Sequence, residues 1–436
     1  MKAYSTLKGV LDILQPEILL WNKIEEITRA VLQNFGYTEL RIPIIESTEL
    51  FIRGIGETSD IVSKEMYTFN DRAGRSISLR PEGTASLVRS YIEHGLNNTP
   101  QPWKYYYIGP MFRYERPQKG RFRQFYQIGA EFLGNAAPVA DAEIISMIDT
   151  IFKALHLPDV TVEVNTTGCR LCRPLYRDAL VGFFTSEASK TNMLCDDCKV
   201  RLVKNPLRVL DCKVPTCIEL RKGAPLITEY VCDECREHDE AFKGFLNEID
   251  IKYVENPEIV RGLDYYTKTA FEFTTEHLGA QKAVAAGGRY DNLVADFGGP
   301  KTPAVGFAIG VERLAELLRQ RLDVYVCAPL IFFAVLGKEA QRMAFKLSTR
   351  YRQAGVYTEI GNALHTLKNQ LKRADKMAAR FVIIIGEEEI NKNAVIFKDL
   401  VNHTQEEVPL DGVLEGVLGC IKGKQAAYNK QKINFS

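Results

Sequence analysis

The sequence lacks the signals that direct a chain to a membrane or to the secretory pathway. It contains no run of about 18 apolar residues, so we expect no membrane-spanning helix and no membrane partner. Its first residues, Met1 to Ser5, include no apolar signal core. Of its ten cysteines, eight crowd between Cys169 and Cys235, unlike the disulfide framework of a small secreted domain. These absences predict a protein of the reducing cytoplasm.

A strong charge of either sign is also missing. Lys and Arg number 56 against 55 Asp and Glu, so the whole chain has no basic character typical of a nucleic-acid partner. Any RNA-binding surface must therefore come from local clusters. The chain has 436 residues, 46% of them hydrophobic, which is enough for a large core and more than one domain.

Four motifs of common nucleotide and hydrolase sites are absent as well. The sequence has no G-x-x-x-x-G-K-[ST], no G-x-G-x-x-G after a strand, no His-Glu-x-x-His and no G-x-S-x-G. Their absence argues against a P-loop enzyme and against a dinucleotide-binding first domain. If the protein binds a nucleotide, arginine side chains must hold it.

The sequence does contain a basic hairpin. Residues 104–132 read as two strands around a turn, and residues 112–123 carry five positive charges and one negative. Gly120 permits a tight turn, and a guanidinium grips a phosphate through two hydrogen bonds. The hairpin suits a polyphosphate or an RNA end, although a solvated basic surface fits the same composition.

Periodicity and composition divide the chain into domains. Residues 1–168 and 241–324 read as one α+β domain, and residues 169–240 read as a Cys-rich insertion into it. Strands alternate with helices in residues 325–422, which predicts a compact α/β domain. Residues 423–436 are polar and read as a flexible tail.

Two helices are predicted near the end of the α/β domain. The first covers residues 363–379, with Leu364 in its apolar stripe, and the second covers residues 410–421. The first helix also carries Lys368, Lys372 and Lys376 along one ridge. That ridge fits an RNA backbone, and it fits a solvated face equally well.

Several segments, read in order, resemble one family. Gly109 to Gln118 resembles motif 2 of class II aminoacyl-tRNA synthetases, Gln127 to Glu131 continues it, and Val305 to Leu314 resembles motif 3. Segments characteristic of histidyl-tRNA synthetases are resembled by Arg80-Pro81-Glu82-Gly83-Thr84, Arg261-Gly262-Leu263-Asp264-Tyr265-Tyr266 and Ala286-Gly287-Gly288-Arg289-Tyr290-Asp291. The resemblance runs from about Leu7 to Ile421, and motifs in this order are far more specific than one alone.

The resemblance implies a fold and an activity. The fold is that of a class II synthetase, an α+β catalytic domain on a mostly antiparallel sheet, followed by an anticodon-binding α/β domain at residues 325–422. The activity is that of a histidine–tRNA ligase, which activates histidine with ATP to histidyl-adenylate and transfers it to tRNA(His). Histidine, ATP with Mg²⁺, tRNA(His) and a second copy of the chain in a homodimer are then the partners.

The chemistry of activation explains the arginines. Negative charge builds on the α-phosphate as the histidine carboxylate attacks it, so preorganised cations are the main requirement. By resemblance, Arg113 and Arg261 are the catalytic cations on the α-phosphate, Arg313 binds the γ-phosphate, and Arg121 also binds ATP. Without the motifs, Arg261 and Arg313 would read as structural ion pairs. Arg116 and Gln118, in the hairpin turn, are candidates for the tRNA acceptor end.

Histidine selection requires groups that recognise an imidazole, which in its neutral form offers one donor and one acceptor. The family places a carboxylate and a tyrosine hydroxyl for this task at the positions of Glu131 and Tyr266. The other histidine-binding positions implied by the resemblance are Glu82, Gly83, Thr84, Gln127, Tyr265 and Tyr290. Ordinary strand packing is the alternative for the pair Tyr265-Tyr266.

The Cys-rich insertion has the pattern of a metal site. Its three Cys-x-x-Cys pairs are Cys169 with Cys172, Cys195 with Cys198, and Cys232 with Cys235; Cys212 and Cys217 lie between the last two pairs. Two such pairs can form a tetrahedral zinc site. The gaps are longer than in compact zinc ribbons, so structural Zn²⁺ and reduced buried thiols both remain open.

A paralogous group offers the rival interpretation. Its members keep this catalytic fold without the anticodon domain and bind histidine as regulators of ATP phosphoribosyltransferase. The retained Arg113, Arg261 and Arg313, together with a complete C-terminal α/β unit, favour the ligase.

Overall fold

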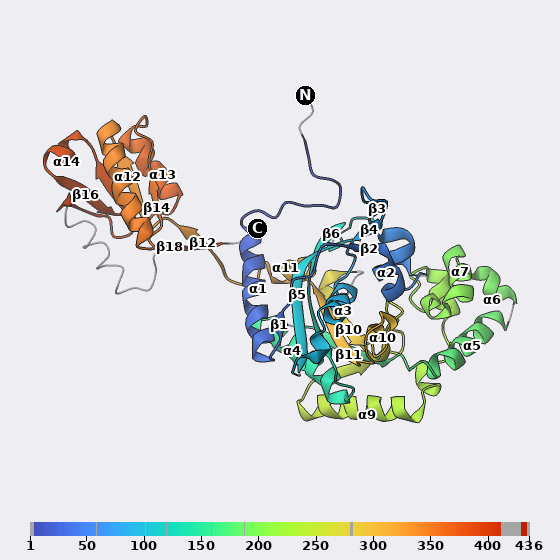
Figure 1. The fold of residues 1–436 in the computed structure, drawn as a ribbon. Coiled ribbons are helices and arrows are strands. Elements are labelled where there is room, and N and C mark those ends of the chain that lie inside the picture. The colour runs from blue at the N-terminus through green and yellow to red at the C-terminus, as the bar shows by residue number, and fades with distance from the viewer. Residues whose placement is uncertain are drawn as a thin grey trace. The chain divides into compact units, whose positions relative to one another are not determined.

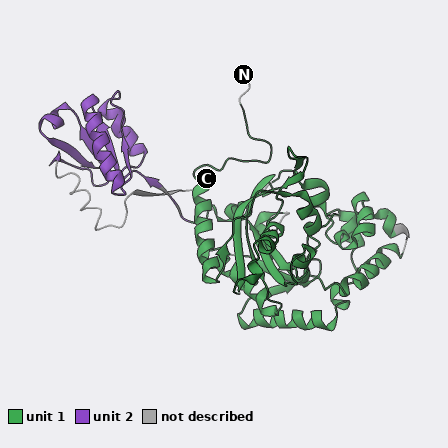
Figure 2. Ribbon diagram, in the orientation of Figure 1, with its two compact units in different colours: residues 1–322 green, residues 323–436 purple. Residues whose placement is uncertain are grey.

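The computed structural model describes residues 4–410 except 58, 101, 119, 158, 187, 280 and 281, together with the strand at residues 429–433. The chain forms two compact units, residues 1–322 and 323–436 (Figure 2). Across these described residues, no helix has both the length and the apolarity needed to cross a membrane.

An eight-stranded sheet forms the centre of the first unit (Figure 1). Its strands run in the order β1 (Thr38–Glu39), β5 (Trp103–Phe112), β6 (Gln124–Leu133), β11 (Ala304–Gly310), β10 (Ala283–Arg289), β9 (Thr267–Thr274), β7 (Thr161–Thr166) and β8 (Tyr253–Glu255). Only the edge pairs β1–β5 and β7–β8 are parallel. The predicted mostly antiparallel sheet is therefore confirmed.

Helices cover both faces of this sheet. On one face lie α1 (Glu17–Asn34), α4 (Pro138–Ala154) and α11 (Val311–Leu318). The first of these buries Leu20, Ile24, Thr28 and Val31, a stripe at helical spacing that accounts for its docking. On the other face, α2 (Thr48–Ile55), α3 (Thr84–Glu93) and α10 (Leu293–Asp296) pack together. A small sheet of β2 (Ile45–Ser47), β4 (Ser76–Leu79) and β3 (Thr68–Asn70) adjoins α2.

The Cys-rich segment is helical. It contains α5 (Cys172–Thr185), α6 (Ala188–Met193), α7 (Asp196–Lys204), the short 3₁₀ turn η3 (Pro206–Val209), α8 (Pro215–Leu220) and the start of α9 (Asp233–Glu248). Tyr176, Leu180 and Phe184 belong to its own hydrophobic core. Helix α9 packs along α4, so the far end of the segment rests on the sheet-bearing part of the unit (Figure 1).

The second unit is an α/β domain, as predicted. Its five-stranded sheet has the order β14 (Thr358–Ile360), β13 (Ile331–Val335), β15 (Phe381–Ile385), β16 (Ala394–Asp399) and β17 (Thr404–Pro409). Strands β14, β13 and β15 are parallel, and β16 pairs antiparallel with both β15 and β17. The helices are α12 (Lys338–Gln353), α13 (Leu367–Lys376) and the short α14 (Glu387–Asn391).

Some predictions for this unit differ from the structure. The helix expected over residues 363–379 begins at Leu367, because the Thr366 hydroxyl caps it by accepting from the Asn369 backbone N–H, and Leu364 is 91% exposed. The helix expected at residues 410–421 lies outside the described residues, apart from its first residue. Within the predicted tail, β18 (Asn429–Ile433) pairs with β12 (Val324–Ala328).

Candidate active site

On the face of the sheet that packs against α3, the middle strands carry mostly glycine and alanine. Residues paired across neighbouring strands share a face, as do alternate residues along one strand. One row consists of Glu131, Gly306, Gly288 and Ala270, and the next consists of Gly129, Ala308, Ala286 and Glu272. Between β6 and β9, only Gln127, Glu131 and Glu272 therefore project large polar side chains from this face.

Glu131 is the most constrained of these groups. Its side chain is 1% exposed; the hydroxyl of Thr84 donates to Oε1 at 2.7 Å and that of Tyr290 donates to Oε2 at 2.6 Å. A Cβ atom at Gly306 would overlap Oε2, so only glycine fits opposite it. Burial raises the pKa of Glu131 to about 8. Burial therefore favours the protonated form of this carboxyl.

Three tyrosines surround that carboxyl. The ring centroid of Tyr265 lies 4.8 Å from that of Tyr266 and 5.5 Å from that of Tyr290, and all three side chains are buried. Tyr265 and Tyr266 precede β9, so the alternation of a strand does not separate them. Both pack into the same cluster as Tyr290.

The segment before α3 provides further polar groups. The carboxylate of Glu82 accepts from the backbone N–H groups of Thr84 at 2.6 Å and Ala85 at 2.9 Å, and burial raises its pKa. A Cβ at Gly83 would overlap the Tyr107 ring. On β6, the Oε1 atom of Gln127 is buried and has no donor among the described groups. A buried acceptor without a donor is the kind of group that a bound ligand can satisfy.

The hairpin arginines and the motif 3 arginine lie together. Glu115 binds Arg121 at 2.9 Å and Arg113 at 3.8 Å. Arg313, at the start of α11, donates to the carbonyl of Gly120 at 3.4 Å. Burial lowers the pKa of Arg313, and so do the positive charges of Arg121 and Arg113. Such a concentration of cations favours an anionic ligand.

Arg113 also contacts the segment before α3. Its Nε donates to the carbonyl of Pro81 at 2.9 Å, and its guanidinium lies 5.2 Å from the ring centroid of Phe125. Its charge acts on Glu82, whose pKa it lowers against the larger effect of burial. Arg113 therefore lies between the ion pair of Glu115 with Arg121 and the polar groups at the start of α3.

Arg261 reaches the same face from the other side. Its Nη1 donates to Oε1 of Glu272 at 2.6 Å, and its guanidinium lies 5.2 Å from the ring centroid of Tyr266. Its buried Nε has no acceptor among the described groups. The negative charge of Glu272 also acts to raise the pKa of Arg313. Arg261 and Arg313 thus both lie near Glu272, although they are far apart in sequence.

The predicted tRNA contacts lie at the tip of the hairpin. Gln118 and Arg121 exchange two backbone hydrogen bonds that close the turn. Arg116 and Gln118 are exposed. They are therefore accessible to a macromolecule, away from the buried groups around Glu131.

The cysteines gather in two groups of four. The root group consists of Cys169, Cys172, Cys232 and Cys235, and the distal group consists of Cys195, Cys198, Cys212 and Cys217. The sequence interpretation missed Cys212 and Cys217 as candidate ligands, because it followed the Cys-x-x-Cys pattern. Their own spacing, Cys-x-x-x-x-Cys, was the available signal.

A buried ionic network was also missed. Arg289 is 0% exposed and binds Asp141, itself 0% exposed, at 2.5 Å, with His238 of α9 3.3 Å from the same carboxylate. Asp291 lies 3.1 Å from Arg289. This network joins α4, α9 and β10. The Ala286 to Asp291 motif contains Arg289 and Asp291, but no motif links them to Asp141 or His238.

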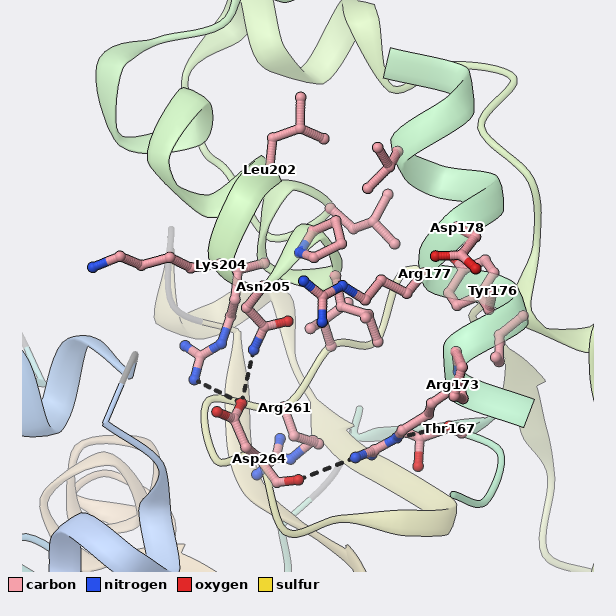
Figure 3. Close-up of a pocket in the computed structure, with 18 of the residues that line it drawn as sticks. Thr167, Arg173, Tyr176, Arg177, Asp178, Leu202, Lys204, Asn205, Arg261 and Asp264 are labelled. Atoms are coloured by element: carbon pink, nitrogen blue, oxygen red, sulfur yellow. Dashed lines mark hydrogen bonds and ion pairs between the residues drawn. The ribbon is translucent and has the colours of Figure 1, made fainter. Parts of the chain in front are cut away.

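A cavity of about 1000 Å³ opens beside the site, between the Cys-rich helices and the loop of residues 257–266 (Figure 3). Arg261 and Tyr266 line it, whereas Glu131 and Arg113 do not. Further basic side chains in its lining are Arg170, Arg173, Arg177, Lys199, Lys204 and Arg208. The tightly hydrogen-bonded groups around Glu131 thus form a site next to the cavity.

Comparisons with known proteins identify the family. The family model of histidyl-tRNA synthetase matches residues 9–181 and 221–314, and that of the anticodon binding domain matches residues 331–419. The histidine–tRNA ligase of Thermodesulfovibrio yellowstonii is 52% identical over 412 residues, 94% of this chain and 97% of the relative.

Solved structures agree as well. The crystal structure of apo histidyl-tRNA synthetase from S. aureus has a TM-score of 0.78 at 35% identity, covering 95% of this chain and 99% of that one. A structure described as an ATP phosphoribosyltransferase regulatory subunit/histidyl-tRNA synthetase from Bacillus halodurans C has a TM-score of 0.62 at 19% identity, covering 88% and 98%. This second likeness shows the fold alone.

The antiparallel sheet with its arginine-bearing hairpin, followed by an anticodon-type domain, defines an aminoacyl-tRNA synthetase. Within that class, the chain belongs to the histidyl-tRNA synthetase family.

Proposed function

We propose that the protein activates histidine with ATP and transfers it to tRNA(His). The observation that carries this proposal is the position of Arg261 beside Glu272, on the sheet face that also bears Glu131 and Gln127. A pocket for an imidazole and a set of cations for phosphates thereby border one another. The identity to a histidine–tRNA ligase over nearly the full chain supports this activity over the regulatory alternative.

Each polar group around Glu131 has a role in holding histidine. The carboxyl of Glu131 and the hydroxyl of Tyr266 would bind the two imidazole nitrogens, since neutral imidazole needs one partner of each kind. Gln127 and Glu82 would accept from the α-ammonium group, with Thr84 beside them. Tyr265 and Tyr290 would enclose the ring, and Gly83 keeps the segment close to Tyr107. A site with fixed polar partners rejects analogues that lack them.

The arginines would act on ATP. Arg113 and Arg261 would stabilise the charge that builds on the α-phosphate, while Arg121 and Arg313 hold the outer phosphates. The phosphates themselves offer the oxygen ligands that Mg²⁺ prefers, and the ion would neutralise charge there. Two carboxylates beside these arginines, Glu115 and Glu272, are already paired with arginine.

The remaining parts of the proposal concern partners. Arg116 and Gln118 would meet the acceptor end of the tRNA, and the second unit would bind the anticodon. The proposal also includes a homodimer formed through the first unit and a cytoplasmic location. It further includes zinc bound in the Cys-rich segment. The closed grouping of the cysteines supports the zinc.

Histidine-dependent exchange of pyrophosphate into ATP tests the activation step. We expect exchange by the unmodified protein, and a loss of roughly 100-fold or more in kcat in Arg113→Gln and Arg261→Gln, because a lost transition-state donor costs about 3 kcal/mol. Arg75→Gln is the matched control, since the Arg75 side chain is exposed and its ion pair among the described residues is with Asp71. Binding of histidine without any exchange would favour the regulatory alternative instead.

A further inference from the structure

The two cysteine groups have the geometry of closed zinc sites. In the root group, Cys169 Sγ lies 3.5 Å from Cys172 Sγ and 3.9 Å from Cys232 Sγ, and Cys172 Sγ lies 3.9 Å from Cys235 Sγ. A tetrahedron with Zn–S bonds of about 2.3 Å has edges of about 3.8 Å. A disulfide would require about 2.05 Å, and an iron–sulfur cage between the thiolates would hold them farther apart than the 4.8 Å that spans each group.

The distal group repeats this geometry. Cys195 Sγ lies 3.8 Å from Cys212 Sγ, and all four sulfur atoms again lie within 4.8 Å of one another. Three of these cysteines are buried, which leaves no open coordination position of the kind a catalytic zinc needs. The group lies between residues 182 and 220, the stretch that the histidyl-tRNA synthetase family model does not match.

Backbone N–H groups point at sulfur atoms in both groups. The N–H of Cys232 lies 3.1 Å from Cys172 Sγ, and the N–H of Cys195 lies 3.3 Å from Cys217 Sγ. Cys195 and Cys232 are also the N-cap residues of α7 and α9, so both helix dipoles act on them. Amide donors to sulfur are the outer partners that orient metal ligands.

Side chains next to both cysteine groups donate hydrogen bonds to the loop of residues 257–266. Cys172 begins α5, and the next residue, Arg173, donates to the carbonyl oxygens of Asp264, at 3.1 Å, and of Tyr266. The root group also joins the first and last parts of the Cys-rich segment. An ion there would fix the position from which Arg173 reaches the loop.

Cysteines of the distal group flank a second set of hydrogen bonds to the same loop. Between Cys198 and Cys212, Arg208 donates to the Gly262 carbonyl at 2.5 Å and Asn205 donates to the Asp264 carboxylate at 3.0 Å. Figure 3 shows Arg173 and Asn205 approaching Asp264 from two different helical segments, with Arg261 in the same loop. The loop that carries Arg261 and Tyr266 is therefore held by residues that the two cysteine groups anchor.

We propose that each group binds one zinc ion, and that the two ions together position the Arg261 to Tyr266 segment for histidine binding. The second half of this proposal rests on the proposed function, whereas the first half does not. Arg173 is then a positioning residue, since it touches the loop backbone and not the substrate.

Zinc content tests the first half. For protein purified under reducing conditions from zinc-supplemented medium, elemental analysis should give two zinc ions per chain, and one in Cys172→Ser and in Cys198→Ser. Cys327→Ser is the matched control, because Cys327 is exposed and lies outside both groups, and it should retain two. If a variant fails to fold, cobalt titration of the unmodified protein decides: two equivalents with thiolate-to-cobalt absorption are expected. Absence of bound metal, or iron in its place, would overturn the proposal whether or not the protein activates histidine.

The histidine KM tests the second half. We expect Arg173→Ala to keep both zinc ions and to raise the KM for histidine roughly tenfold with a smaller change in kcat, since it removes charged donors to the loop. Arg177→Ala is the matched control, because Arg177 lies on the same helix but donates within the insertion, to Val203. Stripping zinc from the unmodified protein should produce the same KM increase, reversed by added zinc. An unchanged KM in Arg173→Ala, or in the stripped protein, would refute the positioning role.

Discussion

The protonation of Glu131 makes a distinct prediction about how histidine affinity depends on pH. Burial raises the pKa of this carboxyl to about 8, because desolvation outweighs the lowering effect of the two hydroxyl groups that donate to it. The pKa of a free imidazole is about 6.5. The bound pair favours one shared proton. Without it, the buried carboxylate would keep an uncompensated charge beside a neutral ring, and with a second proton, the imidazolium would face a neutral carboxyl.

The sign of the pH effect follows from these two values. Between pH 6.5 and 8, the carboxyl brings the proton and the imidazole arrives neutral, so binding changes no net protonation. Below this window the imidazolium must release a proton, and above it the ionised carboxyl must take one up. The affinity is proportional to the fraction of protonated Glu131 multiplied by the fraction of neutral imidazole. This product predicts an affinity about eightfold weaker at pH 5.5 and at pH 9 than at pH 7.

Glu131→Gln isolates the contribution of the carboxyl. The amide is nearly isosteric, so it fits opposite Gly306, and it cannot ionise. We expect it to bind histidine about 2 kcal/mol more weakly, roughly 30-fold, because a charge-assisted hydrogen bond is lost. In Glu131→Gln, histidine affinity should still fall at low pH, but the fall at high pH that Glu131 causes should disappear. The α-amino group of histidine titrates in both proteins and cancels in the comparison.

Calorimetric titration of histidine without ATP provides the measurement. Repeating it in buffers of different ionisation enthalpy counts the protons exchanged on binding. The unmodified protein should take up more protons above pH 8 than Glu131→Gln does. Identical alkaline limbs in the two proteins would refute the assignment of Glu131 as the proton carrier.

Two further substitutions test the packing of the first unit. Gly306→Ala places a methyl group against the carboxyl that faces it, so we expect about 1–3 kcal/mol of overpacking and a KM for histidine raised at least fivefold; Gly244→Ala, in open space, should leave KM unchanged. Arg289→Met strands the buried charge of Asp141, and denaturant titration should show about 3–5 kcal/mol of lost stability, against less than about 1 kcal/mol for Arg75→Ala in an exposed pair. Equal KM values in the glycine variants, or equal unfolding midpoints in the arginine variants, would contradict these expectations.

Several features could be read from the sequence because they depend on neighbours along the chain. The basic hairpin needed only two strand-like runs and Gly120, which lies at φ 70° in the turn. Glu82 caps the start of α3 through residues two and three positions later. The motifs around Arg113 and Arg313 likewise identified the candidate cations directly. The assignment of the imidazole and phosphate partners stays a prediction that the experiments above test.

Only the tertiary structure decided which distant residues meet. The pKa of Glu131 depends on burial beneath Thr84 and Tyr290, which come from separate elements. The pairing of cysteines into a root and a distal group depends on how α5, α7 and α9 pack, and no spacing rule distinguishes it from the other possible pairings. Sequence patterns record local conformational preferences and the types of side chain present, whereas desolvation and long-range contact arise from the packing of the whole unit.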